Sequence, residues 1–161
     1  MDTLLPLGAE IGALLKARGQ TVAIAESSSG GLVSAALLAA PGASAWYRGG
    51  GVIYTGQAFR GLMGLSRADI EGMRSSTEPY AQLLARTIAG KLDADWGLSE
   101  TGAAGPTGNG YGDAAGHTCV GLSGPGGLQT ARTLETGLTD RAENMRRFAA
   151  EALNLLRAAL D

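Results

Sequence analysis

Apolar residues recur along the chain in two patterns, one typical of amphipathic helices and the other of short buried strands. Residues 4–18 carry leucine and isoleucine at helical spacing and end at Gly19, which predicts a helix. Residues 21–25 form a short apolar run that predicts a buried strand. Residues 32–40 predict a second helix, closed by the Pro-Gly pair that follows it. The chain therefore begins with a helix, a strand and a helix.

The same alternation continues to the end of the chain. We expect strands at 52–54, 96–99, 117–122 and 128–133, and helices at 57–63, 67–73, 77–92 and from Asp140 through Leu156. Thr77 is the expected N-cap of its helix. Glycine-rich residues 124–127 are expected to join the last two strands as an antiparallel hairpin. Together these elements predict an α/β fold, a single-domain three-layer α/β/α sandwich with a mixed sheet over residues 1–161.

The charge and the rare residues exclude several classes of partner. The formal net charge of −2 is close to neutral, and no basic stripe or basic amphipathic helix is present. We therefore expect no nucleic acid and no membrane as partner. Cys119 is the only cysteine and His117 the only histidine, so we expect neither an intramolecular disulfide nor a metal site. A single cysteine and a start without the pattern of a signal peptide favour a cytoplasmic protein.

A polar turn follows the first predicted strand directly and precedes a predicted helix. Its sequence, residues 26–31, is Glu-Ser-Ser-Ser-Gly-Gly. The first N–H groups of a helix are unpaired and suit an anion such as phosphate, while serine hydroxyls can donate to phosphate or attack a carbonyl. The alternative is that one serine only caps the helix, since serine is a favoured N-cap residue.

A second candidate segment, residues 101–113, is rich in glycine and begins where a predicted strand ends. This is the edge at which open α/β sheets bind ligands. The segment has neither the Gly-Lys-Ser/Thr ending of a phosphate-binding Walker loop nor a dinucleotide fingerprint. It is either a functional loop or a mobile surface loop.

Both segments carry a resemblance to a known family. Residues 25–31, Ala-Glu-Ser-Ser-Ser-Gly-Gly, resemble the Ala-Glu-Ser-Cys-Thr-Gly-Gly motif of the CinA C-terminal domain, which includes nicotinamide-nucleotide amidohydrolases. Residues 101–106, Thr-Gly-Ala-Ala-Gly-Pro, resemble its Thr-Gly-Ile-Ala-Gly-Pro. Further short elements follow the family's order, at 41–45, 50–54, 64–65, 77–79 and 140–141. The resemblance covers nearly the whole chain.

The resemblance implies an amidohydrolase that deamidates nicotinamide mononucleotide to nicotinate mononucleotide and ammonia, without metal or cofactor. It assigns the nucleophile to Ser27, and N–H groups of the Gly30-Gly31 turn would stabilise the oxyanion. The candidate catalytic residues are Ser27 and Tyr54. The candidate substrate-binding residues are Ser28, Ser29, Gly30, Gly31, Arg60, Thr101, Gly102, Gly105 and Arg141. The alternative function is that of a catalytically inactive or repurposed CinA-like nucleotide-binding protein.

The chain departs from the family pattern at the position of the general base. The family places a lysine five residues after the tyrosine that corresponds to Tyr54, and here Phe59 occupies that position. The neighbouring Arg60 stays protonated and is a poor base.

Other residues have to be weighed as bases. Glu26, Tyr54, Asp113 and His117 lie near the two motifs. We interpret Glu26 as an anchor of the turn and His117 as a structural residue at a strand end.

Two further expectations concern the last helix and self-association. Met145 stands where a second arginine is expected, with Arg146 one place later, so the phosphate contacts of this helix can differ from the family's. A homo-oligomer is expected if Trp46, Tyr47 and the last apolar helix form a contact surface, and simple core packing is the alternative for these residues.

Overall fold

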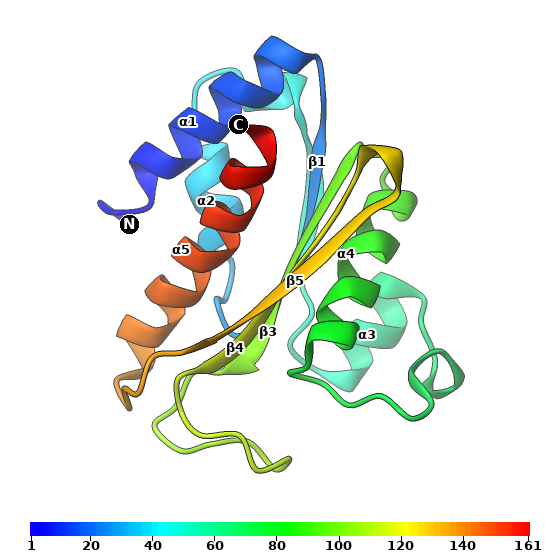
Figure 1. Ribbon diagram of the computed structural model, residues 1–161, viewed down its shortest axis with the longest axis vertical. Helices are drawn as coiled ribbons and strands as arrows, with labels where there is room; N and C mark the ends of the chain where they lie inside the picture. Colours follow the sequence, from blue (N-terminus) through cyan, green and yellow to red (C-terminus); the bar gives the residue numbers. More distant parts are fainter.

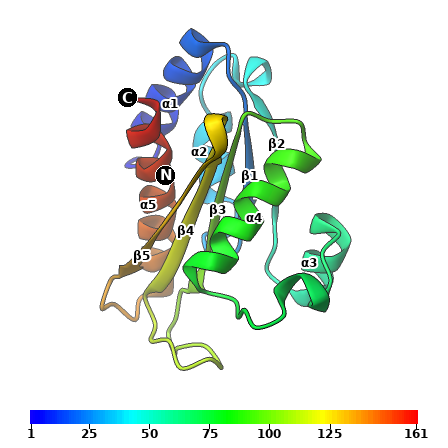
Figure 2. The ribbon, with the colours of Figure 1, turned by 45° about the vertical axis from the view of Figure 1, so that its right-hand side comes forward.

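A five-stranded sheet covered by helices on both faces forms the structure, a computed structural model that describes residues 1–161 (Figures 1 and 2). The strands are β1 (Val22–Glu26), β2 (Tyr47–Val52), β3 (Trp96–Ala103), β4 (His117–Gly124) and β5 (Leu128–Glu135). The helices are α1 (Leu5–Arg18), α2 (Leu32–Leu38), α3 (Gly56–Met63), α4 (Glu78–Lys91) and α5 (Arg141–Leu160). Short 3-10 helices are η1 (Ala43–Ala45), η2 (Arg67–Ile70) and η3 (Pro125–Gly127).

The sheet has the order β2-β1-β3-β4-β5 and is mixed, as predicted. Strands β2, β1 and β3 run parallel, while β4 pairs antiparallel with both β3 and β5. The carboxyl ends of the three parallel strands therefore lie at one edge of the sheet. The Ser-Ser-Ser-Gly-Gly turn of residues 27–31, called the serine turn below, follows β1 at this edge.

Helices cover the two faces unequally, which confirms the three-layer arrangement. Helices α1, α2 and α5 lie on one face and α3 and α4 on the other (Figure 1). A cluster of 21 buried residues fills the first interface, and a cluster of 8 fills the second. Helix α4 lies directly on β3 and β4 because both strands have glycine beneath it. A Cβ atom at Gly97 would lie 1.9 Å from the Ala85 carbonyl oxygen.

Several element boundaries differ from the prediction. The second strand was expected at 52–54 after its glycines, but the glycines form the strand itself in β2. At Gly50 a Cβ would lie 2.7 Å from the Ile24 carbonyl oxygen, so only glycine fits this pairing. The helix expected at 67–73 is the 3-10 helix η2. Strand β3 continues to Ala103 because it pairs with β4 from Gly97 to Ala103, so Thr101 and Gly102 belong to the strand.

The expected cap of α4 also differs. Thr77 occupies the N-cap position, but its hydroxyl donates to the Arg74 carbonyl at 2.8 Å and accepts no N–H of the helix. The last helix begins as predicted, since the Asp140 side chain accepts the Glu143 N–H at 2.9 Å. None of the helices combines the length and the apolarity that a membrane span requires.

Candidate functional site

The serine turn and the start of α2 are held by hydrogen bonds to the carboxylate of Glu26, the last residue of β1. Its Oε2 accepts the Ser29 hydroxyl at 2.8 Å and the N–H groups of Gly31 and Val33 at 3.0 Å, and its Oε1 accepts the Ser34 N–H at 2.8 Å. The side chain is buried. The interpretation of Glu26 as an anchor is confirmed. Because it occupies the first N–H groups of α2, the anion site expected at this helix start is already filled by the protein's own carboxylate.

A second buried carboxylate, Glu100 of β3, holds the same turn from the neighbouring strand. Its Oε2 accepts the N–H of Ser27 at 3.1 Å and that of Ser29 at 2.8 Å, and its Oε1 accepts the Thr118 hydroxyl at 2.8 Å. Burial raises the pKa of Glu100 above its usual value, and these donors offset only part of the rise. Glu100 could not be identified from the sequence, because one acidic residue at the end of an apolar strand has no motif around it.

The three serines of the turn differ in what their hydroxyls contact. Ser28 donates to the Gly102 carbonyl at 2.6 Å, and Ser29 donates to Glu26. The Ser27 hydroxyl forms no hydrogen bond within the protein, and Ser27 lines a cleft. Of the three, only Ser27 presents a free hydroxyl to a ligand.

The main cleft has a volume of about 450 Å³ and lies at the carboxyl ends of the parallel strands. Its walls come from the turn, α3, η2, the segment before α4, the end of β3 and the glycine-rich loop. They comprise Ser27, Ile53, Tyr54, Thr55, Gly56, Phe59, Arg60, Arg67, Ile70, Ser75, Ser76, Tyr80, Thr101, Gly102, Asn109 and Tyr111. Arg60 and Arg67 form no ion pair, and no Asp, Glu, His or Lys lines the cleft. These walls favour an anionic ligand.

Phe59, at the position expected for the family's lysine, is part of the cleft wall. Its ring stacks on Tyr80 with centroids 5.9 Å apart and an angle of 19° between the planes. Both rings are buried in the core between the sheet and α3 and α4. An aromatic pair therefore occupies the part of the cleft wall where the family resemblance places a lysine.

A smaller cleft of about 230 Å³ adjoins the main one, since Tyr54, Gly102 and Asn109 line both. Here Arg141, at the start of α5, donates to the Gly105 carbonyl at 2.5 Å and to the Tyr54 hydroxyl oxygen at 3.1 Å. Because that oxygen accepts from Arg141, the Tyr54 hydrogen is free for another partner.

The predicted site residues are thus divided between the main cleft, the smaller cleft and positions that line neither cleft. Ser27, Tyr54, Arg60, Thr101 and Gly102 line the main cleft, while Ser28, Gly105 and Arg141 line the smaller one. Ser29, Gly30 and Gly31 line neither. The Gly30 N–H donates to the Ser27 carbonyl at 3.1 Å and the Gly31 N–H donates to Glu26, so neither is available to an oxyanion.

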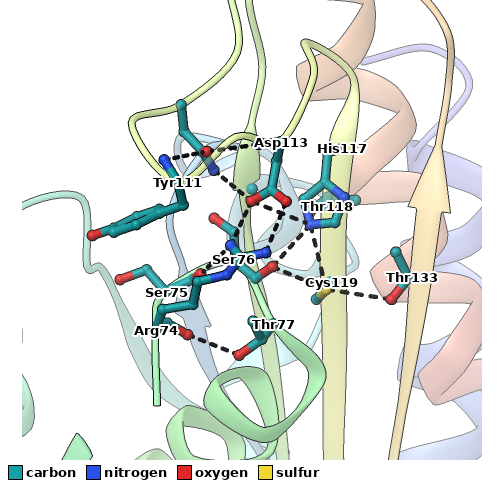
Figure 3. Close-up of polar contacts among 12 residues, drawn as sticks. Arg74, Ser75, Ser76, Thr77, Tyr111, Asp113, His117, Thr118, Cys119 and Thr133 are labelled. Carbon is teal, nitrogen blue, oxygen red and sulfur yellow. Dashed lines mark hydrogen bonds and ion pairs between the residues drawn. The ribbon is translucent and has the colours of Figure 1, made fainter. Parts of the chain in front are cut away.

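The glycine-rich loop is fixed by an ion pair between Asp113 and Arg74, which no pattern in the sequence predicts (Figure 3). Asp113 binds Arg74 through two hydrogen bonds of 2.6 and 2.9 Å and accepts the Asn109 amide at 2.8 Å. The guanidinium of Arg74 lowers the pKa of Asp113 to about 2. Tyr111 lies 5.7 Å from the Arg74 guanidinium and lines the cleft. The loop is therefore an ordered wall of the cleft.

His117 lies behind this wall and does not line the cleft. Nδ1 contacts the Glu135 carboxylate, and Nε2 lies 2.8 Å from the Ser76 carbonyl oxygen. These contacts support its interpretation as a structural residue at a strand end. No group of three or more His, Cys, Asp or Glu side chains is placed to hold a metal ion.

The fold and this geometry define an α/β/α sandwich protein with a polar cleft at the carboxyl ends of its parallel strands. A family model described as the CinA C-terminal domain matches residues 5–160, and the chain belongs to this family.

Curated relatives and solved structures agree with this assignment. The chain is 37% identical over 159 residues to a CinA-like protein of Desulfosudis oleivorans, which covers 99% of this chain and 38% of the relative. It is 40% identical over 154 residues to one of Anaeromyxobacter sp., covering 96% and 37%. The chain thus spans less than two fifths of the length of these relatives. The crystal structure of competence damage-inducible protein A from Klebsiella pneumoniae has a TM-score of 0.90 at 26% identity, covering 98% of this chain and 96% of that one.

Proposed function

We propose that this protein is an amidohydrolase that converts nicotinamide mononucleotide to nicotinate mononucleotide and ammonia, with Ser27 as nucleophile. One observation carries the proposal: Ser27 has the only uncommitted hydroxyl of a turn fastened by two buried carboxylates, and it lines a cleft that contains two unpaired arginines. A fixed turn suits a nucleophile, because catalysis depends on holding the reacting atom in place.

The reaction needs two displacements at the carboxamide carbon. Ser27 Oγ attacks that carbon, the serine proton passes to the leaving nitrogen, and ammonia leaves an acyl-enzyme. Water then attacks the ester carbon, the bond to Ser27 Oγ breaks, and one water proton passes to Ser27 Oγ while the hydroxyl group stays on the product as its carboxyl group. Tyr54 is the proposed proton carrier: its hydroxyl oxygen takes the serine proton while its own hydrogen, which Arg141 leaves free, passes to the leaving nitrogen.

The substrate phosphate is assigned to the arginines of the main cleft. Arg60 and Arg67 have no carboxylate partner, and guanidinium groups bind phosphate through paired hydrogen bonds. Tyr54 and Tyr111 are exposed and offer aromatic surface to the pyridine ring. The family resemblance assigns Arg60 to substrate binding, and the cleft adds Arg67 as a second phosphate ligand.

Ammonia release from nicotinamide mononucleotide tests the proposal. We expect turnover by the protein and none by Ser27→Ala, with nucleotide affinity retained by the variant. Ser123→Ala, which removes a hydroxyl of β4 outside both clefts, should keep full turnover. Turnover that survives in Ser27→Ala would exclude Ser27 as nucleophile.

A nucleotide-binding protein without turnover is the second candidate, because Phe59 replaces the lysine and no His, Lys or carboxylate lines the cleft. The same assay separates the two functions. Calorimetric binding of nicotinamide mononucleotide without ammonia release would favour the binding protein.

A further inference from the structure

His117 sits between two groups that only accept hydrogen bonds. Nε2 faces the Ser76 carbonyl at 2.8 Å, and Nδ1 faces the Glu135 carboxylate. A neutral imidazole carries one N–H and an imidazolium carries two. Both contacts are therefore satisfied only when His117 is protonated on both nitrogens.

The charges around this ring favour the same state. Glu135 comes from β5, and Asp113 of the glycine-rich loop places Oδ2 at 3.8 Å from Nε2. Burial alone would lower the pKa of His117, but the bonds to Glu135 and Ser76 and the charges of both carboxylates outweigh it and raise the pKa.

Three other charged or titratable groups lie on this side of the ring, and only the Cys119 thiol is as close to Nε2 as Asp113 is. Arg74 faces Asp113 from the far side, Cys119 Sγ lies 3.8 Å from Nε2, and Glu78 of α4 contacts Thr133 of β5.

The groups next to His117 belong to the cleft wall. Ser76 is buried and has a φ of 58°, a left-handed conformation that is unfavourable for serine and needs support from its surroundings. Its carbonyl accepts a hydrogen bond from His117 at 2.8 Å and a weaker one from the Cys119 thiol at 3.5 Å, and its N–H donates to Thr101 Oγ1 at 3.3 Å. Asp113 holds Arg74, and Arg74 lies against Tyr111. Figure 3 shows that Ser76 and Asp113 both contact the His117 ring.

We propose that His117, as an imidazolium, is a positioning residue that holds the cleft wall of Ser75, Ser76, Asn109 and Tyr111, so that loss of its proton loosens this wall and weakens substrate binding. The nucleotide part rests on the proposed function, whereas the loosening of the wall does not. Neutral His117 loses either the Ser76 or the Glu135 contact, and it no longer offsets the charge of Asp113. We expect loss of the His117 proton to change the affinity for the nucleotide more than the rate of the chemical step, because His117 contacts neither Ser27 nor the cleft interior.

The chain offers a direct measurement, since His117 is its only histidine. Its ring proton gives one NMR signal whose pH titration reports the His117 pKa. Amide hydrogen exchange of residues 109–113 reports the wall, and calorimetry reports the Kd of nicotinamide mononucleotide from about pH 6 to about pH 9. Three variants accompany the protein: His117→Gln, Glu135→Gln and, as a matched loss of a distant carboxylate, Glu151→Gln.

We expect His117 to titrate above the ordinary value of about 6.5. The exchange of residues 109–113 relative to the intrinsic, base-catalysed rate at each pH should rise, and the Kd should weaken about tenfold over the same pH range, while kcat changes little. His117→Gln should show the weakened Kd without this pH dependence. Glu135→Gln should shift all three profiles to lower pH, and Glu151→Gln should leave them unchanged.

Other results would overturn the proposal. A His117 pKa at or below 6.5, or exchange of residues 109–113 that ignores its titration, would show that the imidazolium does not hold the wall. A Kd that responds to pH equally in His117→Gln would exclude its role in binding. If the nucleotide does not bind at all, the proposed function fails, and the exchange profile still decides whether His117 holds the wall.

Discussion

Glu100 accepts the backbone N–H of Ser27 at 3.1 Å from a position with no exposed surface. The nucleophile candidate is therefore located by a carboxylate behind it, on a different strand, 73 residues away in sequence. Because Glu26 holds the other side of the same turn, Ser27 is the part of the turn that is free to face the cleft.

Replacing Glu100 separates its hydrogen bonds from its charge. Glu100→Ala leaves the N–H groups of Ser27 and Ser29 without their acceptor, while the Thr118 hydroxyl keeps the Thr101 carbonyl at 3.2 Å. We therefore expect a loss of about 2 to 4 kcal/mol in the free energy of unfolding. Glu100→Gln keeps a carbonyl for the N–H groups and offers an amide to Thr118, so we expect a change of about 1 kcal/mol or less. Urea unfolding measures both.

The pH dependence of these variants has a definite sign. The pKa of Glu100 is raised by burial, so its contribution to stability is complete below its usual pKa and decreases as pH rises through the folded-state value. Glu100→Gln should lose this decrease. Equal losses in Glu100→Ala and Glu100→Gln would mean that the hydrogen bonds to the turn do not determine the stability.

Restoring the family's lysine tests whether the missing base limits the reaction. Phe59→Lys places an amine in the cleft wall that Ser27 also lines, and we expect faster ammonia release than in the unmodified protein. Loss of the buried ring and its stacking on Tyr80 should cost about 2 to 4 kcal/mol of stability. Phe59→Leu is the control, with a similar loss of stability and no gain in rate. A folded Phe59→Lys variant that is no faster would contradict the idea.

Apolar periodicity was sufficient to predict most of the fold. The last helix from Asp140, the hairpin at 124–127 and the mixed sheet follow from local patterns that tertiary packing reinforces. The prediction was wrong where the glycines at 49–51 were interpreted as a segment that precedes the strand. In β2 the glycines are the strand, because the neighbouring backbone of β1 leaves no room for a side chain at Gly50.

The site was only partly predictable, for a physical reason. Ser27, Tyr54 and Arg60 belong to local motifs and do line one cleft. Glu100 and the Arg74–Asp113 pair act across the fold, and Arg74 and Asp113 are 39 residues apart in sequence. A single sequence has no pattern that pairs such residues, since the contact exists only after β3, β4 and the loop are in place.

Tyr54 is the next residue to test, because its hydroxyl is bound by Arg141 at 3.1 Å. If Tyr54 carries the proton, Tyr54→Phe should lower kcat about a hundredfold or more with little change in KM. Tyr47→Phe removes a tyrosine hydroxyl of β2 outside both clefts and should leave kcat unchanged. A Tyr54→Phe effect confined to KM would assign Tyr54 to substrate binding instead.

The Arg74–Asp113 pair predicts an acid limit for the ordered loop. Arg74 lowers the pKa of Asp113 to about 2 from its usual 3.8, so the pair's contribution is complete above that usual pKa and is lost as pH falls towards about 2. We expect Asp113→Asn to lower Tm by about 1 to 3 °C at neutral pH, a small effect because the Arg74 side chain of the pair is exposed to solvent. The Tm difference between the protein and the variant should vanish as pH approaches about 2. Arg74→Gln should behave alike, and the double variant should lose little more than either single one. A difference that stays constant down to the acid limit would show that the ion pair does not fix the loop.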